Sequence, residues 1–188
     1  MYSPTSSEGA APPIIDLSGE RAEVARQVRA ACSSWGAFVA TGHGVPLQLL
    51  DQVLAAGHSF FDLPLEVKQR LCLTQQGTSW RGYMALGGES SEQGARVDHK
   101  EGLYLGAEHA DTDPRVLAGL PTFGRNVLPD AELPGMRGLV ASWVGEMRGL
   151  GDRVMELLSL GLGLEPTYIG DHVTRGEPVL LPRACSGS

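Results

Sequence analysis

The sequence has few cysteines and no segment suited to a membrane. Cys32, Cys72 and Cys185 form no Cys-x-x-Cys pair, so neither a disulfide framework nor a zinc site is indicated. The first residues, MYSPTSSEGAAPP, lack the basic and apolar regions of a secretory signal. No apolar run approaches the roughly 20 residues that a transmembrane helix needs. We therefore expect a cytoplasmic protein.

The chain also lacks clusters of positive charge. No two lysine or arginine residues are adjacent, and the formal net charge of the 188 residues is −7. A stripe able to neutralise phosphates is missing, which argues against nucleic acids and anionic membranes as partners. Hydrophobic residues make up 42% of the chain, enough for the core of one domain of ordinary size.

Glycine and proline divide the first half into short segments. The pattern predicts strands at 13–17 and 37–41, because both runs are short, apolar and bounded by turn residues. It predicts helices at 20–35, after 46 and at 65–71 from apolar spacings of three and four. Residues on the inward faces of the first two helices are expected to be Val24, Val28, Ala31, Cys32, Trp35, Leu47, Leu50, Leu54, Phe60 and Phe61.

The second half contains the longest periodic segment. Apolar residues recur at three and four positions over 136–158, which predicts a helix of about six turns. Before it, glycine-bounded runs at 81–86 and 101–105 predict two strands, and 106–134 has no period and is expected to be loop. A short helix at 167–172 and a strand at 178–181 are expected after it.

Seven short motifs occur along the chain in a characteristic order. They are PIIDL at 13–17, WGAF at 35–38, GHGVP at 42–46, FFDLPLEVK at 60–68, RGY at 81–83, DHKE at 98–101 and GLGL at 161–164. Their order and spacing resemble the amino-terminal region of the isopenicillin N synthase-like Fe(II)/2-oxoglutarate-dependent dioxygenases. The resemblance covers residues 13 to about 181.

The resemblance implies an α/β (α+β) fold whose helices and short strands would flank a double-stranded β-helix, or jelly roll. It implies a flexible tail at 1–12, a non-haem dioxygenase N-terminal-like domain at 13–134, and a scaffold helix and first strand at 135–181 leading into the core. Residues 182–188 match nothing in the family. The jelly-roll core is therefore expected to be mostly absent from this chain.

The family implies Fe(II) and 2-oxoglutarate as cofactors and a small molecule as substrate. Because the family's metal ligands and its Arg-x-Ser motif belong to the jelly roll, we expect them to be missing here and the chain to be inactive alone. Whether the chain is itself an enzyme stays open. The alternative is a non-enzymatic protein that binds a partner through an exposed apolar face of the long helix.

One set of residues has the chemistry of an iron site. His109, Asp111 and His172 supply two imidazoles and a carboxylate, the ligand types of the facial triad of non-haem iron oxygenases, and Arg183 follows as a co-substrate anchor. Their context differs from the family's, since His109 lies in a loop and a long helix separates it from His172. We expect a coincidence, with a functional triad as the alternative.

The motif RGY is the other candidate, as a substrate-binding element. Arg81 offers a fork for a carboxylate, Tyr83 a phenol, and Gly82 a close approach of the backbone. The resemblance implies that this strand borders the substrate pocket. The alternative is structural: Arg81 would pair with Glu89 or Glu101, and Tyr83 would pack as an aromatic residue of the sheet.

Overall fold

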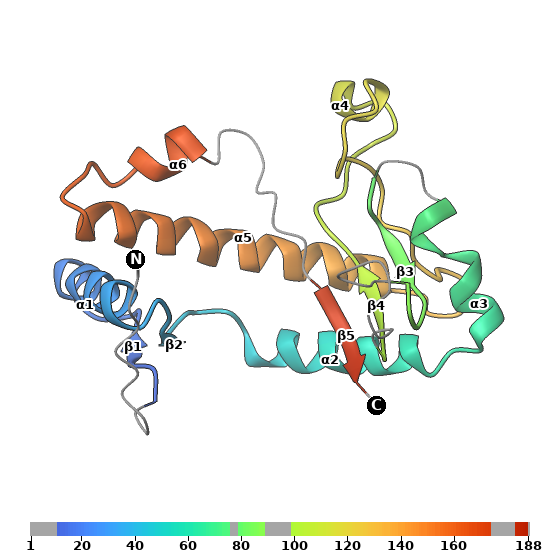
Figure 1. Cartoon of the computed structure of the whole chain (residues 1–188), viewed down its shortest axis with the longest axis horizontal. Helices are drawn as coiled ribbons and strands as arrows, with labels where there is room; N and C mark the ends of the chain where they lie inside the picture. Colours follow the sequence, from blue (N-terminus) through green and yellow to red (C-terminus); the bar gives the residue numbers. More distant parts are fainter. Residues whose placement is uncertain (1–10, 76–78, 89–98, 174–182, 188) are drawn as a thin grey trace. The chain divides into compact units, whose positions relative to one another are not determined.

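The structure is a computed structural model that describes residues 11–75, 79–88 and 99–173, together with the backbone of 183–187. The chain divides into two compact units, each described by itself (Figure 1). Unit 1 comprises Met1–Gly44 and Arg148–Glu177, and unit 2 comprises Val45–Met147 and Pro178–Ser188.

Unit 1 is a two-stranded parallel sheet covered by a helix. The strands β1 (Ile14–Asp16) and β2 (Val39–Thr41) pair with Ile14 opposite Val39. Helix α1 (Arg21–Ser34) begins at Glu20, whose carboxylate accepts hydrogen bonds from the first-turn amides of Ala22 and Glu23. Its apolar face packs on the sheet and on the end of the long helix. The core residues of unit 1 are Ile15, Val24, Ala25, Val28, Ala31 and Leu157.

The GHG turn after β2 is fixed by a close approach. Asp16 accepts hydrogen bonds from the amide and the hydroxyl of Ser18, which also lowers the pKa of the Asp16 carboxyl. Gly42 lies against this carboxylate at φ +58°, and a Cβ at this position would overlap it. Only glycine combines a positive φ with the absence of a Cβ, so the packing of unit 1 explains the first glycine of the GHG sequence.

Unit 2 is a three-stranded antiparallel sheet with helices against it. The sheet order is β3 (Gly82–Met84), β4 (Lys100–Tyr104) and β5 (Arg183–Gly187), with Tyr83 opposite Leu103. Helices α2 (Leu47–Phe61) and α3 (Leu65–Arg70), the 3-10 turn η1 (Leu73–Gln75) and the one-turn helix α4 (Pro114–Leu117) complete it. The core residues are Phe60, Tyr83, Leu103, Leu128, Met136 and Val140.

The long helix is confirmed as α5 (Met136–Gly161), and a short helix α6 (Tyr168–Val173) follows it. Met136 and Val140 are buried in unit 2 and Leu157 in unit 1, whereas Met147 is exposed. The strand expected at 178–181 lies outside the described residues, and β5 forms further along, at Arg183–Gly187. Within the described part of the chain, no helix is long and apolar enough to cross a bilayer.

The predicted inward face of the second helix is wrong for its three leucines, while Phe60 and Phe61 do pack on the core of unit 2. Leu47, Leu50 and Leu54 are all exposed, and in α2 only Phe60 is buried. The reason is that periodicity identifies residues that share a face, while only the end of α2 meets the core of unit 2.

Two residues of the first helix also differ from the prediction. Cys32, expected to be buried, is exposed. Trp35 follows the last residue of α1 as its C-cap and is 41% exposed. Because the helix ends before Trp35, this residue does not continue the apolar face of α1. The helical spacing therefore predicted burial for a residue that is exposed. Cys72 is half-buried.

The two ends of α2 should respond differently to truncation. We expect Phe60→Ala to lower the free energy of unfolding by about 3–5 kcal/mol, because Phe60 is fully buried and leaves a cavity. Leu54→Ala, on the same helix but 54% exposed, should change it by no more than about 0.5 kcal/mol. Urea unfolding followed by circular dichroism measures both. Equal losses would contradict this burial pattern.

Candidate functional site

A partly buried carboxylate joins three elements of unit 2. Oε2 of Glu101, on β4, accepts hydrogen bonds from Lys68 Nζ of α3 at 2.9 Å and from the hydroxyl of Tyr83 of β3 at 2.6 Å. Lys68 Nζ also donates to the carbonyl of Phe61 at 2.7 Å and lies 5.6 Å from the centre of the Tyr83 ring. Lys68 is buried, so its charge depends on Glu101 for compensation.

The same contacts fix the protonation of Tyr83. Its side chain is 1% exposed, and burial raises the pKa of the hydroxyl well above its usual value. The hydrogen bond to Glu101 and the charge of that carboxylate raise the pKa further. The hydroxyl is therefore a donor to Glu101.

Arg81 is buried and donates to backbone carbonyls. It is 2% exposed, its Nη2 donates to the carbonyl of Thr122 at 2.8 Å, and its Nη1 to that of Ser79 at 3.4 Å. Its Nε has no partner within the described part of the chain. Burial lowers the pKa of the guanidinium, an effect that Glu108 partly opposes.

These contacts differ from the pairing that the sequence suggested for Arg81. Glu101 is taken by Lys68 and Tyr83, and Glu89 lies outside the described residues. The packing of Tyr83 as a sheet aromatic is found. A substrate contact by Arg81 or Tyr83 stays a prediction.

The loop that follows β4 is closed at its base by side chains. Asn126 accepts a hydrogen bond from the amide of Gly106 and donates to its carbonyl, at 2.9 and 2.8 Å. Glu108 accepts from Asn126 and from Arg137, and Arg137 also pairs with Asp130. The two ends of the loop 106–126, which carries α4, are thus held together (Figure 1).

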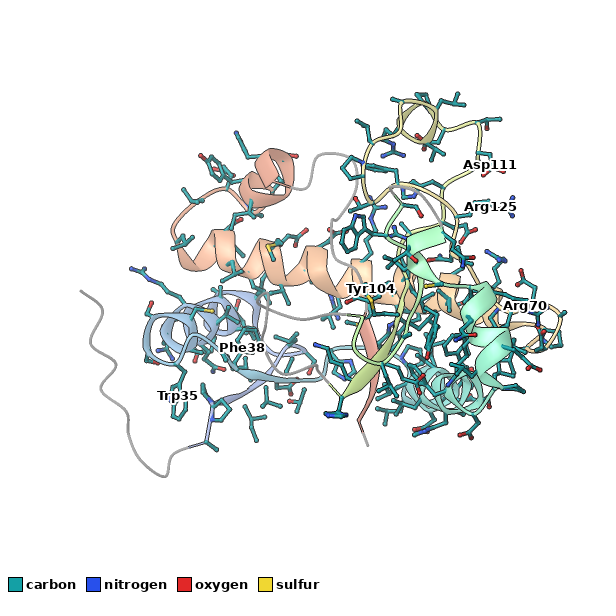
Figure 2. The ribbon with its side chains drawn as sticks, turned by 45° about the vertical axis from the view of Figure 1, so that its right-hand side comes forward. Trp35, Phe38, Arg70, Tyr104, Asp111 and Arg125 are labelled. Carbon is teal, nitrogen blue, oxygen red and sulfur yellow. The ribbon has the colours of Figure 1, made fainter. Side chains whose placement is uncertain are left out.

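The candidate iron ligands lie in unrelated surroundings. The His109 ring is buried, with Nδ1 3.4 Å from the carbonyl oxygen of Gly124 and its edge against Phe123. Asp111 is exposed and pairs loosely with Arg125 at 3.6 Å, and both side chains extend from the rim of unit 2 (Figure 2).

The third candidate, His172, belongs to α6 of unit 1. Its Nδ1 lies 2.7 Å from the carbonyl oxygen of Tyr168, and the two rings stack. Among the residues that the structure describes, which include all three candidates, no three His, Cys, Asp or Glu side chains lie close enough to hold a metal ion. We assign no chemical step to these three residues, and the coincidence expected from the sequence stays a prediction. The side chain of Arg183 is outside the description.

Sequence reasoning passed over Trp80, which the structure makes prominent. Trp80 and Thr122 are the two residues other than glycine with positive φ in the described part of the chain, at +53° and +71°. Both lie beside Arg81, one as its neighbour and one as its hydrogen-bond acceptor. No sequence pattern marks a positive φ at tryptophan or threonine.

Comparison with known families gives these elements their context. The family model described as the amino-terminal region of the non-haem dioxygenases in morphine synthesis matches residues 12–131. The chain belongs to this non-haem dioxygenase N-terminal family. The resemblance seen in the motifs is thereby confirmed, as is the mixed α/β fold.

Two relatives show the extent of the similarity. The 2-oxoglutarate-dependent dioxygenase thnC of Trichoderma harzianum is 36% identical, over 84% of this chain and 50% of its own length. The 2-oxoglutarate-Fe(II) type oxidoreductase hxnY of Emericella nidulans is 32% identical, over 88% of this chain and 50% of its own. The chain thus spans about half the length of these curated relatives.

A solved structure shares the fold. A full-length Neurospora crassa protein in complex with alpha-KG superposes with a TM-score of 0.77 at 22% identity, over 96% of this chain and 55% of that one. Fe(II) and 2-oxoglutarate are the cofactors of the family, as the names of the curated relatives state. The described residues of this chain supply no ligand set for the iron.

The Glu101 network should behave as a coupled pair. Lys68→Met and Glu101→Gln should each cost about 3–5 kcal/mol of unfolding free energy, because each leaves a buried polar group uncompensated. The double variant should lose clearly less than the sum of the two. Chemical denaturation of the four proteins measures the coupling, and additive losses would show that the two side chains do not interact.

The cradle of Arg81 can be tested at Gly106. A Cβ at Gly106 would overlap the Arg81 guanidinium, so Gly106→Ala should destabilise the protein by about 1–3 kcal/mol. Gly145, in α5, has open space at the Cβ position, and Gly145→Ala should stabilise by about 0.5–1 kcal/mol. Thermal unfolding gives both signs. A neutral Gly106→Ala would mean that Arg81 does not occupy this position.

Proposed function

We propose that the chain is the amino-terminal part of an Fe(II)/2-oxoglutarate-dependent oxygenase that acts on a small molecule. The match of residues 12–131 to the family is the observation that carries the proposal. The substrate class is supported by a structural neighbour, since the Neurospora crassa protein is also known in complex with alpha-KG and thymine. A cytoplasmic location is part of the proposal and rests on composition.

We further propose that the chain does not turn over 2-oxoglutarate by itself. Two observations support this. No group of three metal-ligating side chains occurs among the described residues, and the relatives are about twice as long as the matched region. The iron ligands would come from polypeptide corresponding to the other half of the relatives. In this arrangement β3 borders the substrate site, with Arg81 and Tyr83 as its candidate substrate-binding residues.

A non-enzymatic role is the second candidate. It is favoured by the exposed leucines Leu47, Leu50 and Leu54 along α2, which form an apolar row on one helix. This row is a second candidate partner surface beside the face of the long helix. Sedimentation of the whole chain separates the enzymatic from the partner-binding role. If the leucine row of α2 is a binding surface, the chain should associate, and Leu50→Lys should weaken that association.

The proposed inactivity is tested by adding Fe(II), 2-oxoglutarate and oxygen to the purified chain. We expect no succinate above a no-protein control, because no three-ligand iron site is present among the described residues. His109→Ala provides the matched variant. Succinate formation by the chain that is lost on His109→Ala would overturn the proposal and make His109 a metal ligand.

A further inference from the structure

Trp80, two residues before the start of β3, lies outside the core. Trp80 is 49% exposed, although it directly precedes the buried residues Arg81 and Tyr83. Its indole N–H has no hydrogen-bond partner in the portion of the chain described. A large aromatic ring with a free donor is well suited to bind a ligand, because it offers an apolar face and one polar atom.

The exposure of Trp80 is imposed by its neighbours. The guanidinium of Arg81 donates to the carbonyl of Ser79, the residue before Trp80, and to the carbonyl of Thr122 in the loop after β4. The amide of Tyr83 donates to the carbonyl of Leu71 at 2.8 Å, and Gly82 lies so close to that carbonyl that a Cβ would overlap it. The backbone on both sides of Trp80 is thus held by hydrogen bonds.

This arrangement carries backbone strain. Trp80 has φ +53° and Thr122 has φ +71°, values that are unfavourable for residues with a branched or bulky side chain. Strained residues persist where surrounding contacts over-determine them, and they concentrate at ligand-binding sites. At Trp80 the strain does not bury the indole, so core packing does not explain it.

The second exposed tryptophan lacks these features. Trp35 of unit 1 is 41% exposed, close to the exposure of Trp80. Its φ is −97°, an ordinary helical value at the end of α1 (Figure 2). Trp35 therefore serves as an internal control for exposure without strain and without a fixing arginine.

We propose that the indole of Trp80 is a stacking platform for the planar ring of a small-molecule ligand. That the ligand is a small molecule rests on the proposed function. The inference adds the ligand's chemical class, a flat unsaturated ring. A flat ring is favoured because the face of an indole gains most from offset stacking.

The test uses the whole chain labelled with 5-fluorotryptophan. Its three tryptophans give three fluorine NMR signals, which Trp35→Phe, Trp80→Phe and Trp143→Phe assign. Thymine is titrated as the planar probe and 5,6-dihydrothymine as its saturated counterpart, which keeps the carbonyl acceptors. We expect a saturable shift of the Trp80 signal with thymine, at least about tenfold weaker binding of dihydrothymine, and no shift of Trp35.

Two variants separate a positioned platform from mere exposure. Arg81→Lys keeps the charge but loses the fork that holds both carbonyls, so thymine binding should weaken at least about tenfold. Thr122→Gly keeps the acceptor carbonyl and adopts positive φ without strain, so binding should be retained. If Arg81→Lys fails to fold, the comparison of thymine with dihydrothymine on the unmodified chain still tests whether Trp80 binds a planar ring.

Equal shifts of Trp80 and Trp35, equal binding of the two probes, or no shift with thymine up to its solubility limit would each overturn the proposal. A Trp80 signal that moves with protein concentration alone would also overturn it, because another chain would then cover the indole. The assay contains neither iron nor 2-oxoglutarate. Its outcome is therefore independent of the succinate assay, and failure of one proposal is distinguishable from failure of the other.

Discussion

The carboxylate of Glu101 is the contact on which the interior of unit 2 depends. It brings together Lys68 of α3, Tyr83 of β3 and its own strand β4, and it compensates a lysine charge in a buried position. Such a pair adds little net stability over apolar residues of the same shape, but losing either partner is costly. The network therefore acts mainly to fix one arrangement of these three elements.

The position of β3 has consequences on both sides of the strand. Inside, Tyr83 fills the core and Arg81 reaches the loop that follows β4, whose base Asn126 and Glu108 close. Outside, Trp80 is left with its ring in solvent. The RGY motif thus has a structural role in this unit, whereas Trp80, the residue before it, is exposed.

Periodicity predicted much of the fold, because it reports directly on burial where a helix has a partner. The long helix α5 and the face Val24, Val28 and Ala31 of α1 agree with it. It failed for Leu47, Leu50 and Leu54, since a pattern cannot say whether an apolar face meets anything. The motifs predicted the family correctly because their order carries information that no single motif has.

The candidate site was harder to predict, for a physical reason. The hydrogen-bond acceptors of Arg81 are backbone carbonyls, which every residue has, so the sequence pointed to carboxylates instead. His109, Asp111 and His172 have the right ligand types, yet ligation needs a geometry that composition does not encode. The positive φ of Trp80 is a backbone feature that no residue pattern marks, and the contacts nearest to it are made by Arg81 with Thr122 and by Tyr83 with Leu71.

The central role of Glu101 is tested most directly by following the Tyr83 ring with carbon NMR as the pH is raised. Because folding raises the pKa of Tyr83 above its usual value of 10.0, the stability it contributes is complete below that pH and is lost as the pH rises through the folded pKa. We expect the Cζ signal to stay that of the protonated ring past pH 10.0 for as long as the protein remains folded. Titration of Tyr83 near its usual pKa in the folded protein would contradict the buried hydrogen bond to Glu101.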